Sequence, residues 1–158
     1  MRIVLQRVSH ASVTIDGKVH GAIDHGYMLL VGFKEGDDEK ILKQMADKVV
    51  HLRVFEDDQG KMNLSLLDVK GAILSISQFT LYANCRKGRR PSFIEAAKPA
   101  ISSPLYDRFN EILREQVPVE TGIFGADMKV ALVNDGPVTI TLDSDDICKQ
   151  KTSLILVV

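Results

Sequence analysis

Residues 72–81 read Ala-Ile-Leu-Ser-Ile-Ser-Gln-Phe-Thr-Leu, and the rest of the chain is organised around them. The first half is short, apolar and β-branched, and Gly71 precedes it, which predicts a buried strand. The end of that strand carries two hydroxyls and an amide, in Ser77, Gln78, Phe79 and Thr80. The most basic passage of the chain, residues 84–91, follows directly. This arrangement indicates a polar site for an anionic ligand, although Ser and Thr also commonly satisfy local backbone groups at an ordinary strand end.

The composition is that of one soluble globular domain spanning residues 1–158, with 45% hydrophobic and 26% charged residues. No apolar run approaches the roughly 20 residues of a membrane span, and charge interrupts the N-terminus too early for a signal peptide. Cys85 and Cys148 lack a metal or redox spacing, so we expect a cytoplasmic protein without a membrane partner. A net charge of -1 argues against indiscriminate coating of nucleic acid but allows a local basic patch.

Strands are expected at residues 3–8 and 11–15, followed by a hairpin turn at Asp16-Gly17 and a return strand at 18–23. Residues 27–33 are apolar on both faces, which is typical of a central strand covered on both sides.

Apolar faces predict two helices, and a short motif predicts a third. Asp37-Asp38 can cap the first, whose stripe runs from Ile41 to Leu52. Ser92 and Glu95 have capping-box spacing, so a short helix closed by Pro99 is expected there. The remaining helix begins with Ser103 as cap and Pro104 at its first position, and runs towards Pro118.

Short extended segments at 54–55 and 62–64, an irregular stretch at 121–128 and β-prone residues 129–133 and 138–142 complete the pattern. Many strands without βαβ alternation favour an α+β domain: a largely antiparallel, barrel-like sheet with two or three helices packed on it. The apolar end, residues 154–158, is expected to form an edge strand or a docked tail.

The usual catalytic frames are missing, because the chain has no phosphate-binding glycine loop, no nucleophile elbow and no zinc spacing among its histidines. We therefore predict no metal and no cofactor. Gly136-Pro137 is either a simple turn or a stiff piece of main chain whose carbonyls approach a ligand closely. The basic passage is either a solvated loop or a phosphate-binding one, through Arg86, Lys87, Arg89 and Arg90.

Five ordered motifs resemble the D-aminoacyl-tRNA deacylase family and span the chain from Met1 to about Leu142. They are residues 1–8 (MRIVLQRV), 77–81 (SQFTL), 86–93 (RKGRRPSF), 122–128 (GIFGADM) and 134–139 (NDGPVT). The tail at residues 144–158 departs from the family pattern, being longer and more apolar.

The resemblance implies a homodimeric tRNA-editing hydrolase, acting in proofreading, that cleaves the ester of D-aminoacyl-tRNA and has no role on DNA. It implies that Ser77, Gln78, Phe79 and Thr80 form the catalytic pocket, with Phe124 and Met128 lining it. It also implies that Gly136-Pro137, as a Gly-cisPro pair oriented by Arg7, reaches into the partner's pocket and rejects L-aminoacyl-tRNA. A steric filter of this kind cannot exclude glycine, so glycyl-tRNA, including tRNA(Ala) mischarged with glycine, is an expected substrate.

The sequence leaves the chemistry open between two routes. Thr80 or Ser77 can act as nucleophile, although neither has a base nearby in the sequence. In the other route, which the resemblance favours, the 2′-hydroxyl of the tRNA activates water while the backbone amides of Phe79 and Thr80 stabilise the oxyanion. A non-catalytic RNA-binding module and a general esterase are the rival functions.

Overall fold

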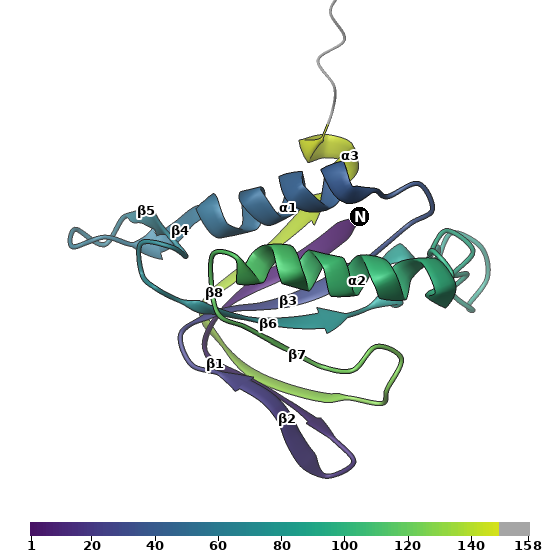
Figure 1. Cartoon of the computed structure of the whole chain (residues 1–158), viewed down its shortest axis with the longest axis horizontal. Helices are drawn as coiled ribbons and strands as arrows, with labels where there is room; N and C mark the ends of the chain where they lie inside the picture. The colour runs from purple at the N-terminus through teal and green to yellow at the C-terminus, as the bar shows by residue number, and fades with distance from the viewer. Residues whose placement is uncertain (149–158) are drawn as a thin grey trace, which may run out of the picture.

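The computed structural model describes residues 1–148, and a curved six-stranded sheet with helices on one face forms its body (Figure 1). The long first strand β1 (Arg2–Ile15) organises this sheet. On one side it pairs along its length with β8 (Lys129–Asp143). On the other side it pairs first with β3 (Gly26–Gly32) and then with β2 (Lys18–Ile23), and all three pairings are antiparallel.

The other half of the sheet is parallel, so the predicted antiparallel character is confirmed only in part. Strand β6 (Ala72–Ser77) runs parallel to β3, and β7 (Val119–Thr121) runs parallel to β6. Parallel neighbours need long crossover connections, and the intervening segments supply them with helices α1 (Glu39–His51) and α2 (Pro99–Arg114). The sheet is nearly closed into a barrel, because Nδ1 of His20 on β2 lies 2.8 Å from the carbonyl oxygen of Thr121 on β7.

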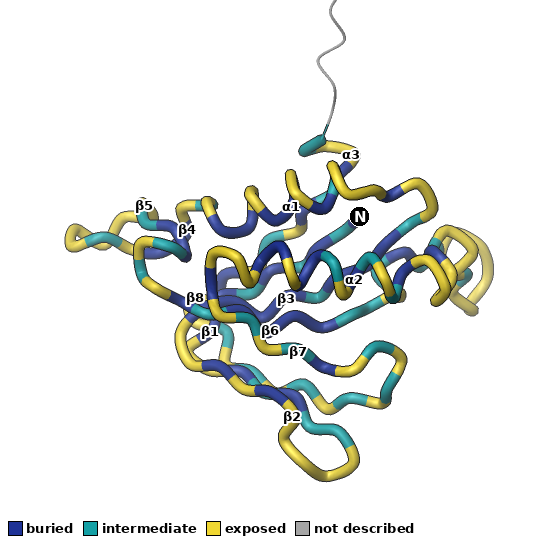
Figure 2. Tube along the Cα trace, in the orientation of Figure 1, coloured by how far each residue is buried: buried dark blue, intermediate teal, exposed yellow. Residues whose placement is uncertain are grey.

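The larger core cluster lies between the sheet and the two helices, and Figure 2 shows buried residues of both in dark blue. A smaller cluster is formed by strand residues alone. Strand β3 is buried along almost its whole length, which confirms the predicted central strand. The predicted hairpin is also confirmed: Asp16 and Gly17 have φ values of 50° and 76°, the left-handed conformation of such tight turns. Helix α1 begins where expected, since the Asp38 side chain accepts a hydrogen bond from the Ile41 amide.

Two pairs of predicted strands are single strands in the structure. Residues 3–8 and 11–15 are continuous in β1, and residues 129–133 and 138–142 are continuous in β8. Residues 9–10 and 134–137, which separated the predicted strands, are accommodated by register shifts in the β1–β8 ladder. The segments around residues 54 and 62 form a separate hairpin of β4 (Arg53–Glu56) and β5 (Met62–Ser65).

The helix boundaries after residue 90 were predicted wrongly. No helix begins at Ser92, which instead forms a β-bridge with Asn84. Pro99 does not close a helix but begins α2, at a position where its missing N–H costs nothing, and Pro104 lies inside that helix. The described residues also contain a 3-10 helix, η1 (Phe79–Tyr82), and the short α3 (Ser144–Ile147). The prediction for residues 154–158 lies outside the described residues.

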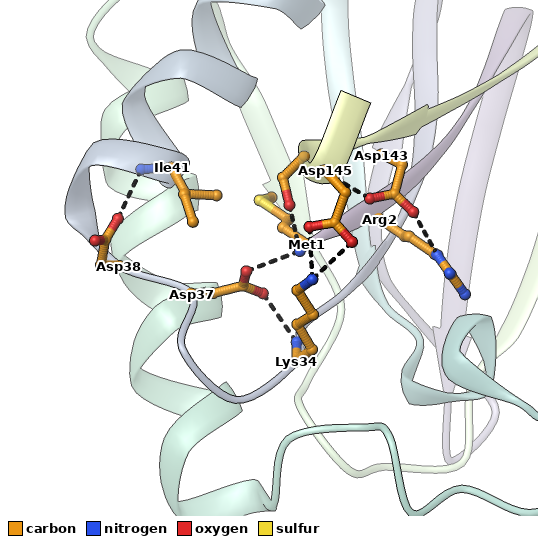
Figure 3. A network of polar contacts seen from close by, with 9 residues as sticks. Met1, Arg2, Lys34, Asp37, Asp38, Ile41, Asp143 and Asp145 are labelled. Carbon is orange, nitrogen blue, oxygen red and sulfur yellow. Dashed lines mark hydrogen bonds and ion pairs between the residues drawn. The ribbon is translucent and has the colours of Figure 1, made fainter. Parts of the chain in front are cut away.

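The amino group of Met1 joins the two ends of the described chain in a buried polar network (Figure 3). It donates to Oδ1 of Asp37 and to Oγ of Ser144, both at 2.8 Å. The paired charges have 0% exposed side-chain area. Burial lowers the pKa of this amino group, and the Asp37 carboxylate opposes that shift. The other Asp37 oxygen accepts from the Lys34 amide, so this carboxylate also fixes the turn before α1.

The variant Asp37→Asn is expected to lower the free energy of unfolding by roughly 3 kcal/mol, because it leaves a buried amino group without its counter-charge. Because burial lowers the pKa of the amine in the folded state, the unfolded state binds more protons than the folded state below the ordinary pKa of this amine. The free energy of unfolding therefore falls as the pH falls. Denaturant melts should therefore show a larger deficit at pH about 6 than at pH about 9.

The control is Asp38→Asn on the neighbouring residue, because Asn caps a helix about as well as Asp and a loss under about 0.5 kcal/mol is expected. Equal losses in the two variants would contradict the assigned role of the buried pair.

Candidate active site

A cavity of about 590 Å³ opens where β6 ends. Three segments line it: the end of β6 with the start of η1, residues 93–102 leading into α2, and the loop between β7 and β8 with the start of β8. Its walls are mainly apolar, and the polar groups come from a few side chains and from main chain. Of the predicted pocket residues, the structure brings together Ser77, Gln78, Phe79, Phe124 and Met128.

The floor of the pocket is held by the backbone of Gln78, whose amide donates to the Val31 carbonyl at 2.8 Å. The next two amides, of Phe79 and Thr80, are the first of η1, and the first amides of a helix have no partner within it. Neither N–H group therefore has a hydrogen-bond partner within η1.

Thr80 does not line the pocket, in contrast to its predicted neighbours. Its side-chain oxygen accepts a hydrogen bond of 2.6 Å from Nε2 of Gln78. An amide is not a base, so this contact does not activate the hydroxyl as a nucleophile. Within residues 1–148, no group of three or more His, Cys, Asp or Glu side chains is arranged to hold a metal ion.

Aromatic and aliphatic side chains form the opposite wall. Phe124 packs at 6.2 Å, between ring centroids, from the buried Tyr106 of α2. Met128 lies over Gly122, where an added Cβ would stand only 2.3 Å from the methionine sulfur. The glycine therefore leaves the space that seats Met128 in the pocket wall.

The first turn of α2 contributes residues that the sequence did not reveal, namely Lys98, Pro99 and Ser102. The prediction missed them because Pro99 was interpreted as the end of one helix instead of the start of another. A proline at the first helical position was the available signal.

The second predicted motif lies outside this pocket, in a bulge of β8. Between the pairs Gln6–Thr139 and Val8–Asn134, Arg7 of β1 faces residues 135–138 of β8, which we call the excursion. The Gly136-Pro137 peptide bond in it is cis, and both residues are exposed. Among the described residues, none of the excursion lines the pocket.

Asn134 clamps the excursion from within β8. Its Oδ1 accepts from the Val138 amide and its Nδ2 donates to the Thr139 hydroxyl, both at 2.8 Å. Gly136 has a φ of 143°, and a Cβ there would lie 2.8 Å from a Val138 methyl and 3.1 Å from an Arg7 nitrogen. Side chains other than hydrogen therefore do not fit at position 136.

Arg7 holds the excursion from the neighbouring strand. Its side chain is only 5% exposed. Nε donates to the Asp135 carbonyl at 2.8 Å and Nη1 to the Val54 carbonyl at 2.7 Å, while Nη2 lies 3.5 Å from Glu56. The predicted orienting residue thus contacts the carbonyl directly before Gly136.

The basic loop, residues 85–91, is fully exposed and is closed by two backbone hydrogen bonds between Asn84 and Ser92, of 2.7 and 2.9 Å. Within the described chain, its four cations make no ion pair with an acidic side chain: they are Arg86, Lys87, Arg89 and Arg90. The loop does not line the pocket. Phe79 precedes the loop and Phe93 follows it, and both of these residues line the pocket.

The helices found in residues 1–148 are all too short or too polar to cross a membrane. A nearly closed α+β barrel, with a mainly apolar pocket and an exposed basic loop beside it, defines the class: a protein built to bind a ligand with both an apolar and an anionic part.

Comparison with known proteins identifies the family. Residues 4–143 match the family model described as D-Tyr-tRNA(Tyr) deacylase. The chain therefore belongs to the D-Tyr-tRNA(Tyr) deacylase family and is an ester hydrolase.

The relatives and solved structures agree with this assignment. D-aminoacyl-tRNA deacylase of Thermomicrobium roseum is 63% identical over 148 residues, which are 93% of this chain and 96% of that protein. That of Geobacillus sp. is 58% identical over 147 residues, 92% of this chain and 97% of the relative. A solved structure named c-Myc DNA Unwinding Element Binding Protein aligns with a TM-score of 0.86 at 41% identity, over 90% of this chain and 98% of its own. A probable eukaryotic D-amino acid tRNA deacylase, with TM-score 0.75, 20% identity and coverage of 89% and 97%, shares the fold.

Proposed function

We propose that this protein hydrolyses the ester between a D-amino acid and the terminal adenosine of tRNA, and that the excursion rejects L-amino acids. The observation that carries the proposal is an exposed piece of main chain fixed by two independent devices, the Arg7 guanidinium and the Asn134 clamp. Such rigidity has no evident use in a solvent-facing turn, but it is required of a steric filter.

The filter has to act in the pocket of a second copy, because the excursion does not line the pocket of its own chain. Strand β8 supports this arrangement: within the described residues it pairs with β1 alone, so its other edge is open. Val133, next to the excursion, is 47% exposed. We therefore propose a homodimer in which each subunit lends its excursion to the other.

Selectivity in this arrangement comes from exclusion. L- and D-residues carry the same groups on one carbon, so attraction to the side chain discriminates weakly between them. A fixed carbonyl at the place an L side chain must occupy adds a repulsive term that the D-isomer avoids. Glycine has no side chain to exclude, so glycyl-tRNA, including glycyl-tRNA(Ala), is also a proposed substrate.

The pocket suggests how the remaining parts of the substrate bind. The terminal adenine fits the apolar wall of Phe124 and Met128, which offers a surface for a planar base. The ester oxygen fits the free amides of Phe79 and Thr80. The backbone phosphates of tRNA fit the four unpaired cations of the basic loop. Since aminoacyl-tRNA is used in the cytoplasm, we place the enzyme there.

For the chemical step we propose that water attacks the ester with help from the 2′-hydroxyl of the tRNA. The geometry around Thr80 supports this route over a threonine nucleophile, because the only side-chain partner of Thr80 in the described chain is the amide of Gln78. The amides of Phe79 and Thr80 then stabilise the oxyanion of the tetrahedral intermediate, which collapses to free amino acid and tRNA.

The proposal is tested by incubating the protein with D-Tyr-tRNA, L-Tyr-tRNA and Gly-tRNA and measuring the amino acid released. We expect release from the D- and glycyl substrates at least about a hundredfold faster than from the L-substrate, since a steric clash discriminates more strongly than a missing contact. Small aryl esters without RNA serve as the control.

Equal release of D- and L-tyrosine would contradict the filter. Binding of all three tRNAs without release would identify an RNA-binding module instead, and efficient cleavage of the small esters would identify a general esterase.

The Thr80→Ala variant separates the proposed route from one in which Thr80 is the nucleophile. It keeps the backbone amide, so we expect kcat to stay within about tenfold of the wild type if the substrate assists its own hydrolysis. If Thr80 is the nucleophile, kcat should instead fall by several orders of magnitude, roughly 10⁴-fold or more. The measurement is single-turnover release of D-tyrosine, with circular dichroism to confirm folding. A covalent tyrosyl-enzyme trapped in the wild type by acid quench would overturn the proposed route.

A further inference from the structure

Two phenylalanine rings are exposed at the rim of the pocket, whereas Phe124 is partly buried and the other three phenylalanines are buried. Phe79 is 54% exposed and Phe93 is 39% exposed, whereas Phe33, Phe55 and Phe109 are at most 3% exposed. The two ring centroids lie 5.0 Å apart with the ring planes at 77°, an edge-to-face arrangement. Large apolar groups left in water in this way usually mark a binding surface.

Both rings are held in place by main-chain contacts from separate segments. Phe79 begins η1, directly after the Gln78 amide that is bonded to β3. Phe93 follows the Asn84–Ser92 bridge, and its carbonyl accepts from the Ala96 amide at 3.1 Å. The pair is therefore a fixed surface and not the tip of a free loop.

The pair of rings lies between the pocket and the basic loop. Both rings contribute to the rim of the pocket, and the same Asn84–Ser92 bridge that precedes Phe93 closes the basic loop. This part of the chain leads into the N-terminal end of α2, where Figure 2 shows exposed backbone. An RNA strand with its last nucleoside in the pocket and its phosphates on the loop has to cross the two rings.

We propose that Phe79 and Phe93 form a stacking site for the unpaired nucleobase that precedes the terminal adenosine of the tRNA. The inference rests on the proposed function and adds a second base-binding position to it. Aromatic rings beside unpaired cations are the combination that binds single-stranded nucleic acid, since every base has a face to stack and every nucleotide a phosphate. An apolar protein partner would not require the four unpaired charges next to the rings.

The test compares two substrates, D-tyrosyl-tRNA and D-tyrosyl-adenosine, because the second has no preceding base. In the variant Phe93→Ala, we expect the ratio of kcat/KM for the tRNA to kcat/KM for the adenosine ester to fall about tenfold or more. Phe93→Tyr keeps a ring and should hold the ratio within about twofold. Val19→Ala, which shortens another exposed side chain on β2, is the matched control.

Salt dependence separates stacking from charge. The effect of losing a phosphate contact on kcat/KM decreases as the salt concentration rises, whereas the effect of Phe93→Ala should persist at about 0.5 M salt. A ratio that stays unchanged in Phe93→Ala, or equal losses on both substrates, would overturn the stacking site. Equal losses would show that the ring is only a wall of the pocket.

Failure of the proposed function is recognised separately, as no release from either substrate by the wild type. In that case an RNA oligonucleotide with the tRNA 3′ sequence and 2-aminopurine at the position before the terminal adenosine tests the inference directly. Quenching on binding to the wild type that is lost in Phe93→Ala supports the stacking site. Quenching that is equal in both proteins, or absent from both, overturns the stacking site. Binding of only another protein at this surface overturns it as well.

Discussion

The buried guanidinium of Arg7 is the interaction on which the rest of the structure depends. One planar group donates to main chain from β8, through Asp135, and from β4, through Val54. A guanidinium can serve separate acceptors in a fixed geometry, which a lysine ammonium cannot reproduce. The excursion, the central strand β1 and the β4–β5 hairpin are therefore fixed relative to one another at a single point.

The mixed sheet explains why the pocket and the excursion lie apart in one chain. The excursion arises in the antiparallel half, where the β1–β8 ladder slips in register opposite Arg7. The pocket arises in the parallel half, where β6 ends and α2 begins. Because these are different parts of the sheet, we propose that a site using both is assembled from two copies, along the edge of β8 that has no partner strand within residues 1–148.

We propose that substrate recognition divides into parts with different physical origins. In this proposal, backbone amides and carbonyls serve the ester and the configuration at the α-carbon. Aromatic and aliphatic side chains serve the bases, and the cations of residues 85–91 serve the phosphates.

Much of the fold was predictable where local signals act alone. The Asp16-Gly17 turn, the Asp38 cap and the buried run of β6 depend on neighbours in sequence, and all three are confirmed. The parallel pairing of β3 with β6 was not predictable, because it depends on a crossover through α1 that no short window contains. Pro99 fits the end of one helix and the start of another equally well, and the outcome depends on the packing of α2 in the core, which no short window of sequence contains.

The candidate site divides in the same way. Ser77, Gln78 and Phe79 follow from their place at a strand end, while Phe124 and Met128 follow only from the family motif. Thr80 belongs to the same motif but turns out of the pocket within η1, a 3-10 helix that the sequence did not indicate. Lys98 and Ser102 line the pocket because α2 begins at Pro99, whereas the sequence predicted that this helix begins after Ser103.

The ratio of kcat/KM for D-Tyr-tRNA to that for L-Tyr-tRNA in an Arg7→Lys variant tests whether the buried guanidinium fixes the excursion as a filter. If the guanidinium fixes the excursion as a filter, the ratio should fall at least about tenfold. Hydrogen exchange at the Val138 amide should rise at the same time, while the midpoint of unfolding still shows a folded protein. An unchanged ratio in a folded variant whose excursion has become mobile would contradict the account.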